Sequence, residues 1–164
     1  MKDIWIRQAT NDDDETITAL NDLAFGGPDE ARIVRQLAAD GDSLSSLVVH
    51  NDREIVGHIQ FFRILVEGAD IAAGLGPMCV HPDHQKRGIG GGLIRIGLTL
   101  MEGAGRNLVF VLGHPDYYPK FGFDAALAEP FSAPWAGEAF MALRFREDGP
   151  SAGALTYPSA FEAG

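Results

Sequence analysis

The sequence lacks the features of a secreted, nucleic-acid-binding or membrane-spanning protein. A single cysteine, Cys79, among 164 residues excludes an intrachain disulfide. Lysine and arginine total 13 against 23 aspartates and glutamates, and the net charge of −10 disfavours nucleic acid, which attracts clustered basic side chains. No apolar run approaches the ~20 residues of a membrane span, and Met1-Lys2-Asp3 leads into acidic residues rather than an apolar targeting segment. These absences predict a cytoplasmic protein without membrane or nucleic-acid partners.

The composition that remains is that of an ordinary folded protein. Hydrophobic residues make up 46% of the chain and charged residues 22%, which is enough apolar material for a packed core. A length of 164 residues suits one domain, because domains usually run to roughly 100–200 residues. We expect a single domain over residues 1–146, followed by a C-terminal tail over residues 147–164 that packs on the domain or is partly flexible.

Apolar spacing and turn residues predict a mixed order of strands and helices. The expected elements are a strand at 4–7, helices at 12–25 and 29–40, strands at 44–51, 54–67 and 71–80, a helix at 88–102, a strand at 107–112, a short helix or turn from 114, and a strand at 139–145. Asn51-Asp52 suits a hairpin turn, and Gly76-Pro77 indicates a bulge or a splayed edge. The order predicts an α+β or mixed α/β fold around one sheet.

Residues 85–92 join a strand to a helix through a polar, glycine-rich turn. Glycine lets the backbone approach a ligand closely, and the first turn of a helix presents unpaired N–H groups with partial positive charge. Lys86 and Arg87 place two cations beside these amides, so the segment suits a diphosphate. The alternative interpretation is a glycine-rich helix start with solvated lysine and arginine.

Two common phosphate-binding motifs do not fit this segment. The dinucleotide fingerprint needs a third glycine where Leu93 stands, and an acidic residue about twenty positions on, where Leu108 stands. The nucleotide P-loop needs Gly-Lys followed by Ser or Thr, which occurs nowhere in the chain. The pattern that remains is Gln-x-x-Gly-x-Gly over residues 85–90, preceded by Val80-His81-Pro82.

These motifs resemble the GNAT superfamily of acetyl-CoA-dependent N-acetyltransferases, in a branch of bacterial type. The Gln-Lys-Arg-Gly-Ile-Gly run over residues 85–90 follows the strand-closing Val80-His81-Pro82, and Tyr118-Pro119-Lys120-Phe121-Gly122-Phe123 is similar to the family's Tyr-x-x-x-Gly-Phe. The element order from Ile4 to about Phe145 also matches. The resemblance implies a GNAT-like fold, with a central mixed, largely antiparallel sheet that is splayed at two parallel strands and flanked by helices.

The family's chemistry, carried over to the matching positions, implies acetyl transfer from acetyl-CoA to a primary amine by direct attack in a ternary complex. The resemblance assigns the pyrophosphate of coenzyme A to Gln85, Lys86, Arg87, Gly88, Ile89, Gly90 and Gly91. It assigns the pantetheine arm to the backbone of Met78, Cys79 and Val80, and it makes Tyr118 the general acid that protonates the departing sulfur. The Asn that the family commonly carries early in the helix before this tyrosine is absent, and Gly113-His114-Pro115 stands there instead.

Several residues are candidates for the base that deprotonates the amine. Glu30 opens a helix on the expected acceptor side, although a glutamate in a first helical turn also complements the helix dipole on a surface. His58 titrates in a useful range, although a structural histidine is the commoner case. Asp70 and His81 are further options. We expect no metal, because His81, His84 and His114 lack the spacing of a metal-binding motif, and we interpret Cys79 as a small core residue rather than a nucleophile.

The acceptor is a small-molecule or peptide amine whose identity the sequence leaves open. The phenylalanines that we assign to the core, with one or two free to line an acceptor pocket, are Phe61, Phe62, Phe121, Phe123 and Phe131. The alternatives in function are a non-catalytic CoA-binding module and an acyltransferase that uses a larger acyl-CoA. We expect a monomer or a homodimer.

Overall fold

The computed structural model describes residues 3–162 and contains a twisted sheet of eight strands. Its order is β1-β2-β3-β4-β5-β7, and β8 pairs with both β3 and β6. On the main path β4 and β5 are parallel and all other neighbours are antiparallel. The strands are β1 Trp5–Gln8, β2 Ser43–His50, β3 Ile55–Val66, β4 Ala69–Val80, β5 Leu108–Leu112, β6 Phe131–Ser132, β7 Phe140–Arg144 and β8 Gly153–Thr156. The predicted mixed, largely antiparallel sheet is confirmed.

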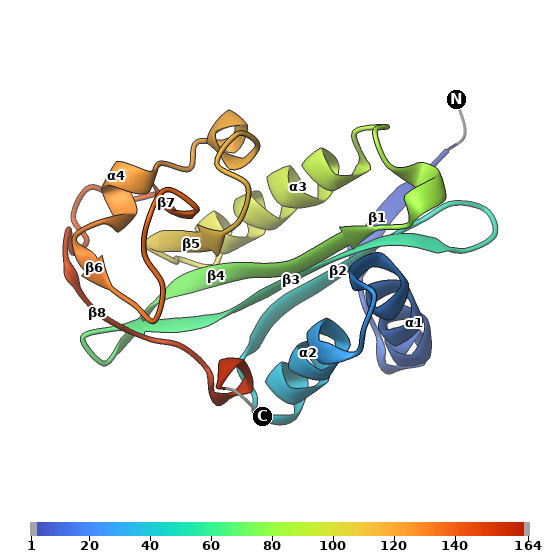
Figure 1. Ribbon diagram of the computed structural model, residues 1–164, viewed down its shortest axis with the longest axis horizontal. Helices are drawn as coiled ribbons and strands as arrows, with labels where there is room; N and C mark the ends of the chain where they lie inside the picture. The colour runs from blue at the N-terminus through green and yellow to red at the C-terminus, as the bar shows by residue number, and fades with distance from the viewer. Residues whose placement is uncertain (1–2, 163–164) are drawn as a thin grey trace.

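Helices cover both faces of the sheet (Figure 1). The helix α3 lies along one face, and α1 and α2 lie against the other. The helices are α1 Asp14–Phe25, α2 Asp29–Ala39, α3 Ile89–Gly103 and α4 Ala125–Ala128, with short 3-10 turns η1 Asn11–Asp13, η2 Pro82–His84, η3 Tyr118–Phe121 and η4 Ser159–Phe161. Every helix and strand that the sequence predicts is present, with ends that differ by at most four residues.

Two buried clusters hold these layers together, one on each face of the sheet. On the α3 face, Leu93 and Ile94 pack onto inward side chains of β3 and β5, including Phe61. On the opposite face, Leu37 of α2 packs with Phe62 and other inward residues. Adjacent residues of β3 therefore serve different faces, as the alternation of side chains along a strand requires.

The sheet opens between β4 and β5, as Gly76-Pro77 led us to expect. The two strands pair only from Ala72 to Leu75, so β4 runs on to Val80 without β5 beside it. On the neighbouring strand, Ile59 pairs with Met78 and Phe61 pairs with Leu75. Two residues of β4, Gly76 and Pro77, therefore stand opposite one residue of β3 in a bulge, and they are joined by a cis peptide bond. The bulge and the early end of the pairing create a gap in the sheet.

The C-terminal segment is built into the fold more firmly than we expected. β8 pairs with Leu65 and Val66 at the end of β3, and the chain then continues to η4, which packs beside α2 (Figure 1), where the Ser159 hydroxyl lies 3.2 Å from a carboxylate oxygen of Asp40. Residues 1–2 of the predicted domain and 163–164 of the predicted tail lie outside the described residues. Within residues 3–162, no helix is long and apolar enough to cross a membrane.

Candidate active site

A cavity of about 1010 Å³ lies at the gap between β4 and β5. Because the gap opens through the sheet, the cavity is lined both by Leu75, which belongs to the α3 face, and by Phe62 and Phe110, which belong to the α2 face. Its chemistry differs from one end to the other. We call the part lined by residues 76–95 and 112–121 the donor half, and the part lined by α1, α2, Phe62, Phe110 and the C-terminal segment the acceptor half.

Backbone amides dominate the donor half. The turn from Gln85 to Gly91 leads into α3, with Lys86 and Gly88 in left-handed conformations at φ of +66° and +79°. Gly92 is the first residue of α3 whose backbone N–H finds a partner, the Gly88 carbonyl at 3.0 Å; for the preceding amides back to Gln85, no backbone or side-chain partner occurs among residues 3–162. A row of unpaired amides at a helix N-terminus binds anions.

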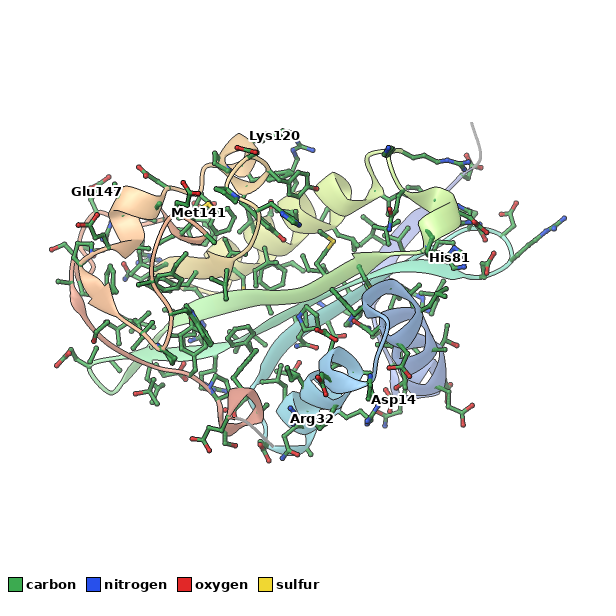
Figure 2. The ribbon with its side chains drawn as sticks, in the orientation of Figure 1. Asp14, Arg32, His81, Lys120, Met141 and Glu147 are labelled. Atoms are coloured by element: carbon green, nitrogen blue, oxygen red, sulfur yellow. The ribbon has the colours of Figure 1, made fainter. Side chains whose placement is uncertain are left out.

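Three cationic side chains face the same half of the cavity. Lys86 extends from the turn, Arg95 from α3 and Lys120 from η3. The guanidinium of Arg95 lies 4.9 Å from the centre of the Phe121 ring, and the Lys120 ammonium lies 5.2 Å from that of Tyr117. Figure 2 shows Lys120 on the η3 side of the sheet. Arg87, which the sequence places beside Lys86 in the turn, is exposed and does not line the cavity.

Tyr118 lines the donor half from η3. Its side chain is 7% exposed and lines the cavity, and burial, with a smaller contribution from Tyr117, raises the pKa of its hydroxyl to about 12. The hydroxyl is therefore protonated at neutral pH and is able to donate. A Cβ atom at Gly113 would overlap the Tyr118 ring, so the glycine after β5 is what lets this tyrosine lie across the strand end.

Tyr117 points toward the donor half. Its hydroxyl would lie 3.3 Å from a Cβ atom placed at Gly90, and its ring meets Tyr118 at 5.2 Å between centroids. The two adjacent tyrosines thus both line the cavity, with their rings nearly perpendicular to each other.

Cys79 lines the cavity from β4, but its environment keeps the thiol protonated. The residue is 5% exposed, and burial raises the pKa of the thiol to about 12. A nucleophilic cysteine needs a lowered pKa and positive surroundings. The geometry therefore agrees with the interpretation of Cys79 as a small buried residue of the strand.

His58 does not reach the cavity. It is completely buried, its Nε2 lies 2.9 Å from the Ser46 hydroxyl, and its Nδ1 lies 3.4 Å from the Asn21 amide nitrogen. Burial lowers the pKa of the imidazole to about 4, so it is neutral at physiological pH. These contacts join β2, β3 and α1, and they describe a structural histidine rather than a base that meets substrate.

Asp70 and His81, the further candidates for proton transfer, do not line the cavity, whereas His84 and His114, considered for metal binding, do. Asp70 pairs with Arg63 and Arg106 at the far end of β4. His81 lies where β4 ends (Figure 2), and its Nδ1 accepts a hydrogen bond of 3.1 Å from the backbone of Asp83. Among residues 3–162, no three His, Cys, Asp or Glu side chains gather as metal ligands.

Glu30 is the acidic side chain of the cavity. It lies in the first turn of α2, half-buried, and it is the only Asp or Glu among the described residues that line the cavity. It makes no ion pair or hydrogen bond with another side chain of residues 3–162. Ile33 lines the cavity from the next turn of the same helix face.

Aromatic rings make up most of the rest of the acceptor half. The rings of Tyr157 and Phe161 contact each other and also contact Phe62 and Trp135, and the centroids of neighbouring rings are 4.5–6.5 Å apart. We call these four residues the aromatic wall. Phe25 and Phe110 line the cavity beside it.

The structure brings most of the predicted site together and adds residues that the sequence did not reveal. The predicted residues that line the cavity are Glu30, Met78, Cys79, Val80, Gln85, Lys86, Gly88, Ile89, Gly90, Gly91 and Tyr118, whereas Arg87 and His58 do not. Phe62 and Phe121 line it among the five phenylalanines considered. The sequence could have identified Arg95 as a cavity residue, because it lies one helical turn after Gly91 on the same helix face. The sequence could not have identified Trp135, Tyr157 and Phe161, because no local pattern shows where in the fold their segment packs.

Comparisons with known proteins agree with this arrangement. A family model described as "Acetyltransferase (GNAT) domain" matches residues 5–126. The chain is 35% identical over 129 residues to the Uncharacterized N-acetyltransferase YjhQ of Escherichia coli (strain K12), which covers 75% of this chain and 71% of the relative. It is 30% identical over 136 residues to the Uncharacterized N-acetyltransferase YhbS of the same organism, covering 80% and 81%.

Two solved structures resemble the whole chain. A GNAT family acetyltransferase from Brucella melitensis, in complex with acetyl-CoA, is 34% identical and superposes with a TM-score of 0.84 over 99% of this chain and 100% of that one. The structure of Escherichia coli YhbS in complex with CoA is 28% identical, with a TM-score of 0.92 over 99% and 94%.

Proposed function

The chain belongs to the GNAT acetyltransferase family, and we propose that it transfers the acetyl group of acetyl-CoA to a primary amine by direct attack in a ternary complex. The family is that of acetyl-CoA-dependent acyltransferases, and the two similar structures were solved with acetyl-CoA and CoA. The observation that carries the proposal is a single cavity that joins unpaired amides at α3, the Tyr118 hydroxyl and the Glu30 carboxylate.

The residues of the donor half fit coenzyme A. The amides from Lys86 to Gly91 would hold its pyrophosphate, with Lys86 and Arg95 supplying positive charge. The stretch of β4 from Met78 to Val80, which has no β5 beside it, would receive the pantetheine arm as an added strand. Arg87, which is exposed and does not line the cavity, would contribute only through its charge at a distance.

Acetyl-CoA supplies an acetyl group activated as a thioester, and the side chains of this protein manage the protons. Glu30 removes a proton from the ammonium form of the acceptor, and the nitrogen then forms a bond to the acetyl carbon while the carbon–sulfur bond breaks. Tyr118 donates its proton to the departing sulfur. The nitrogen then loses its second proton, which passes through solvent to the Tyr118 oxygen and restores the hydroxyl. The products are the N-acetylated amine, CoA with a free thiol and one released proton.

Tyr118 holds the proton that this role requires. Burial raises the pKa of its hydroxyl to about 12, so the group is fully protonated at neutral pH and releases its proton only to a base as strong as a departing thiolate. His58 has no place in the proposal, because it has no surface in the cavity.

Removal of the Tyr118 hydroxyl tests the proposal. We expect Tyr118→Phe to lower kcat by about 100-fold, in the range of a general acid, with the calorimetric Kd for acetyl-CoA unchanged within twofold. Tyr117→Phe, the matched change at the neighbouring hydroxyl, is expected to lower kcat by about threefold at most, a loss far below that of an acid.

Three results would contradict the proposal. If the parent protein does not bind acetyl-CoA, the assignment of the donor half is wrong. If it binds acetyl-CoA but transfers acetyl to no amine, the protein is a CoA-binding module. If a longer acyl-CoA reacts faster in direct competition, acetyl is the wrong group.

A further inference from the structure

The acceptor half indicates the class of amine that reacts, an inference that rests on the proposed acetyl transfer. We propose that the acceptor is a primary monoamine with a ring-sized apolar body, whose ammonium lies at Glu30 and whose body lies against the aromatic wall of Phe62, Trp135, Tyr157 and Phe161.

The charges in the cavity allow one ammonium group on the acceptor. Glu30 is the only carboxylate among the described lining residues, while Lys86, Arg95 and Lys120 are all cationic. A second ammonium on the same molecule would find no further carboxylate among the described lining residues and would lose its hydration without an ionic partner. The cavity therefore favours a monoamine over a polyamine, although the net charge of −10 on the whole chain would attract both.

The aromatic wall is arranged to receive an apolar body. Its rings contact one another at tilted or nearly perpendicular angles of 45–86° and form a continuous surface rather than a box of separate faces around a cation. The Tyr157 hydroxyl, the polar group of this surface, is already 3.4 Å from the indole nitrogen of Trp135. An acceptor thus meets mainly ring carbon, which favours aromatic or other apolar groups.

Three of the four residues of the aromatic wall lie outside the match to the family model. Trp135, Tyr157 and Phe161 all lie beyond residue 126, where the match to the family model ends. The pairing of β8 with β3 and the contact of Ser159 with Asp40 hold this segment against the sheet and α2. The segment therefore adds a specificity surface to a donor half that lies entirely within the family match.

Competing acceptors test this inference. We would measure kcat/KM at saturating acetyl-CoA for 2-phenylethylamine, ethylamine and spermidine, by thiol release with mass spectrometry of the product. We expect 2-phenylethylamine to exceed ethylamine by about 30-fold, because its ring adds several buried carbons, and to exceed spermidine as well.

Matched variants locate the effect. Trp135→Ala is expected to lower kcat/KM for 2-phenylethylamine about tenfold, the loss from removing one packed ring, while kcat/KM for ethylamine and the Kd for acetyl-CoA stay unchanged. Phe161→Leu, a milder change in the same wall, gives a smaller loss in the same direction if Trp135→Ala fails to fold. Trp5→Ala is the control, because Trp5 lies on β1, is 47% exposed and does not line the cavity.

The outcomes separate this inference from the proposed function. Transfer to ethylamine or spermidine at least as fast as to 2-phenylethylamine overturns the inference and leaves acetyl transfer standing. Binding of acetyl-CoA without turnover of 2-phenylethylamine, or equal losses for all amines in Trp135→Ala, also overturns it. Failure of the parent protein to bind acetyl-CoA overturns the proposed function itself.

Discussion

The two halves of the cavity are built in opposite ways. The donor half comes mainly from continuous stretches of chain, residues 76–95 and 112–121, and its backbone amides are the groups suited to a ligand. The acceptor half is assembled from α1, α2, β3, β5 and the C-terminal segment, and it presents side chains. Backbone groups are the same in every protein, whereas side chains differ. A site of this kind can therefore keep its co-substrate while its acceptor changes.

The support beneath the two halves also differs. The donor half rests on the apolar packing of α3, where Leu93 and Ile94 meet β3 and β5. The face that carries the acceptor half includes a buried polar group, in which His58 contacts Asn21 of α1 and Ser46 of β2. This difference makes the acceptor face the more sensitive of the two to acid.

The largest expected effect is a loss of folding stability in acid, which we attribute to His58. Burial lowers the pKa of His58 to about 4, below its unfolded value of about 6.5, so between these pH values the unfolded chain binds the proton and the folded chain does not. Stability is therefore complete above about pH 6.5 and declines as the pH falls toward 4, by about 3 kcal/mol in total.

Urea unfolding at several pH values measures this loss. In His58→Gln, which keeps a hydrogen-bonding side chain but does not titrate, we expect the decline between pH 6.5 and 4 to become much smaller. An equally steep decline in the variant would show that other groups cause the acid sensitivity.

The second prediction tests the donor half. Glutamate at position 90 adds bulk and negative charge where the pyrophosphate would lie, and a Cβ atom there would already lie 3.3 Å from the Tyr117 hydroxyl. We expect Gly90→Glu to weaken acetyl-CoA binding about 100-fold in calorimetry, since like charges placed together cost several kcal/mol.

Gly92→Glu provides the control for this change. Gly92 lies in the same turn of α3 but outside the cavity, and a Cβ atom there would make an ordinary contact of 3.7 Å with Ile6. Its affinity for acetyl-CoA should stay within about twofold of the parent's, a difference of less than 0.5 kcal/mol. Equal losses in both variants would mean that a charge anywhere on the helix start is responsible.

The smallest expected effect is a difference in acetyl-CoA affinity between variants of the neighbouring residues Lys86 and Arg87. Lys86 lines the cavity and Arg87 does not, although both are exposed. We expect Lys86→Gln to weaken acetyl-CoA binding about fivefold and Arg87→Gln less than about twofold, with the difference shrinking at high salt because exposed charges are screened. The reverse order of the two losses would show that the turn binds its ligand from the opposite side.

The glycine turn shows why the donor half was predictable. Its function depends on backbone conformation and on a helix start, and both follow from residues that are neighbours in the chain. The same holds for Gly76-Pro77, whose bulge follows from the lack of a side chain in one residue and of an N–H in the other. Tyr118 was reached through a motif that spans only six residues.

The residues that were misplaced or missed depend on distant contacts. Nothing in the neighbourhood of His58 shows that α1 covers it, because Asn21 is 37 positions away. Lys86 and Arg87 are alike in the sequence, and only the left-handed conformation of Lys86 and the course of the turn decide which one faces the cavity. The C-terminal strand β8 is too short and too polar at its edges to stand out by periodicity.

The amino-acid sequence by itself thus determined most of the helices and strands, the bulge at Gly76-Pro77 and the amide-rich turn, because each arises from interactions within a few residues. Only the tertiary structure decided the acceptor half. Glu30, Phe62, Trp135 and Tyr157 come from segments up to 127 positions apart, and they form one surface because β8 pairs with β3 and η4 packs beside α2. Such contacts depend on the packing of the whole chain, which no local pattern encodes.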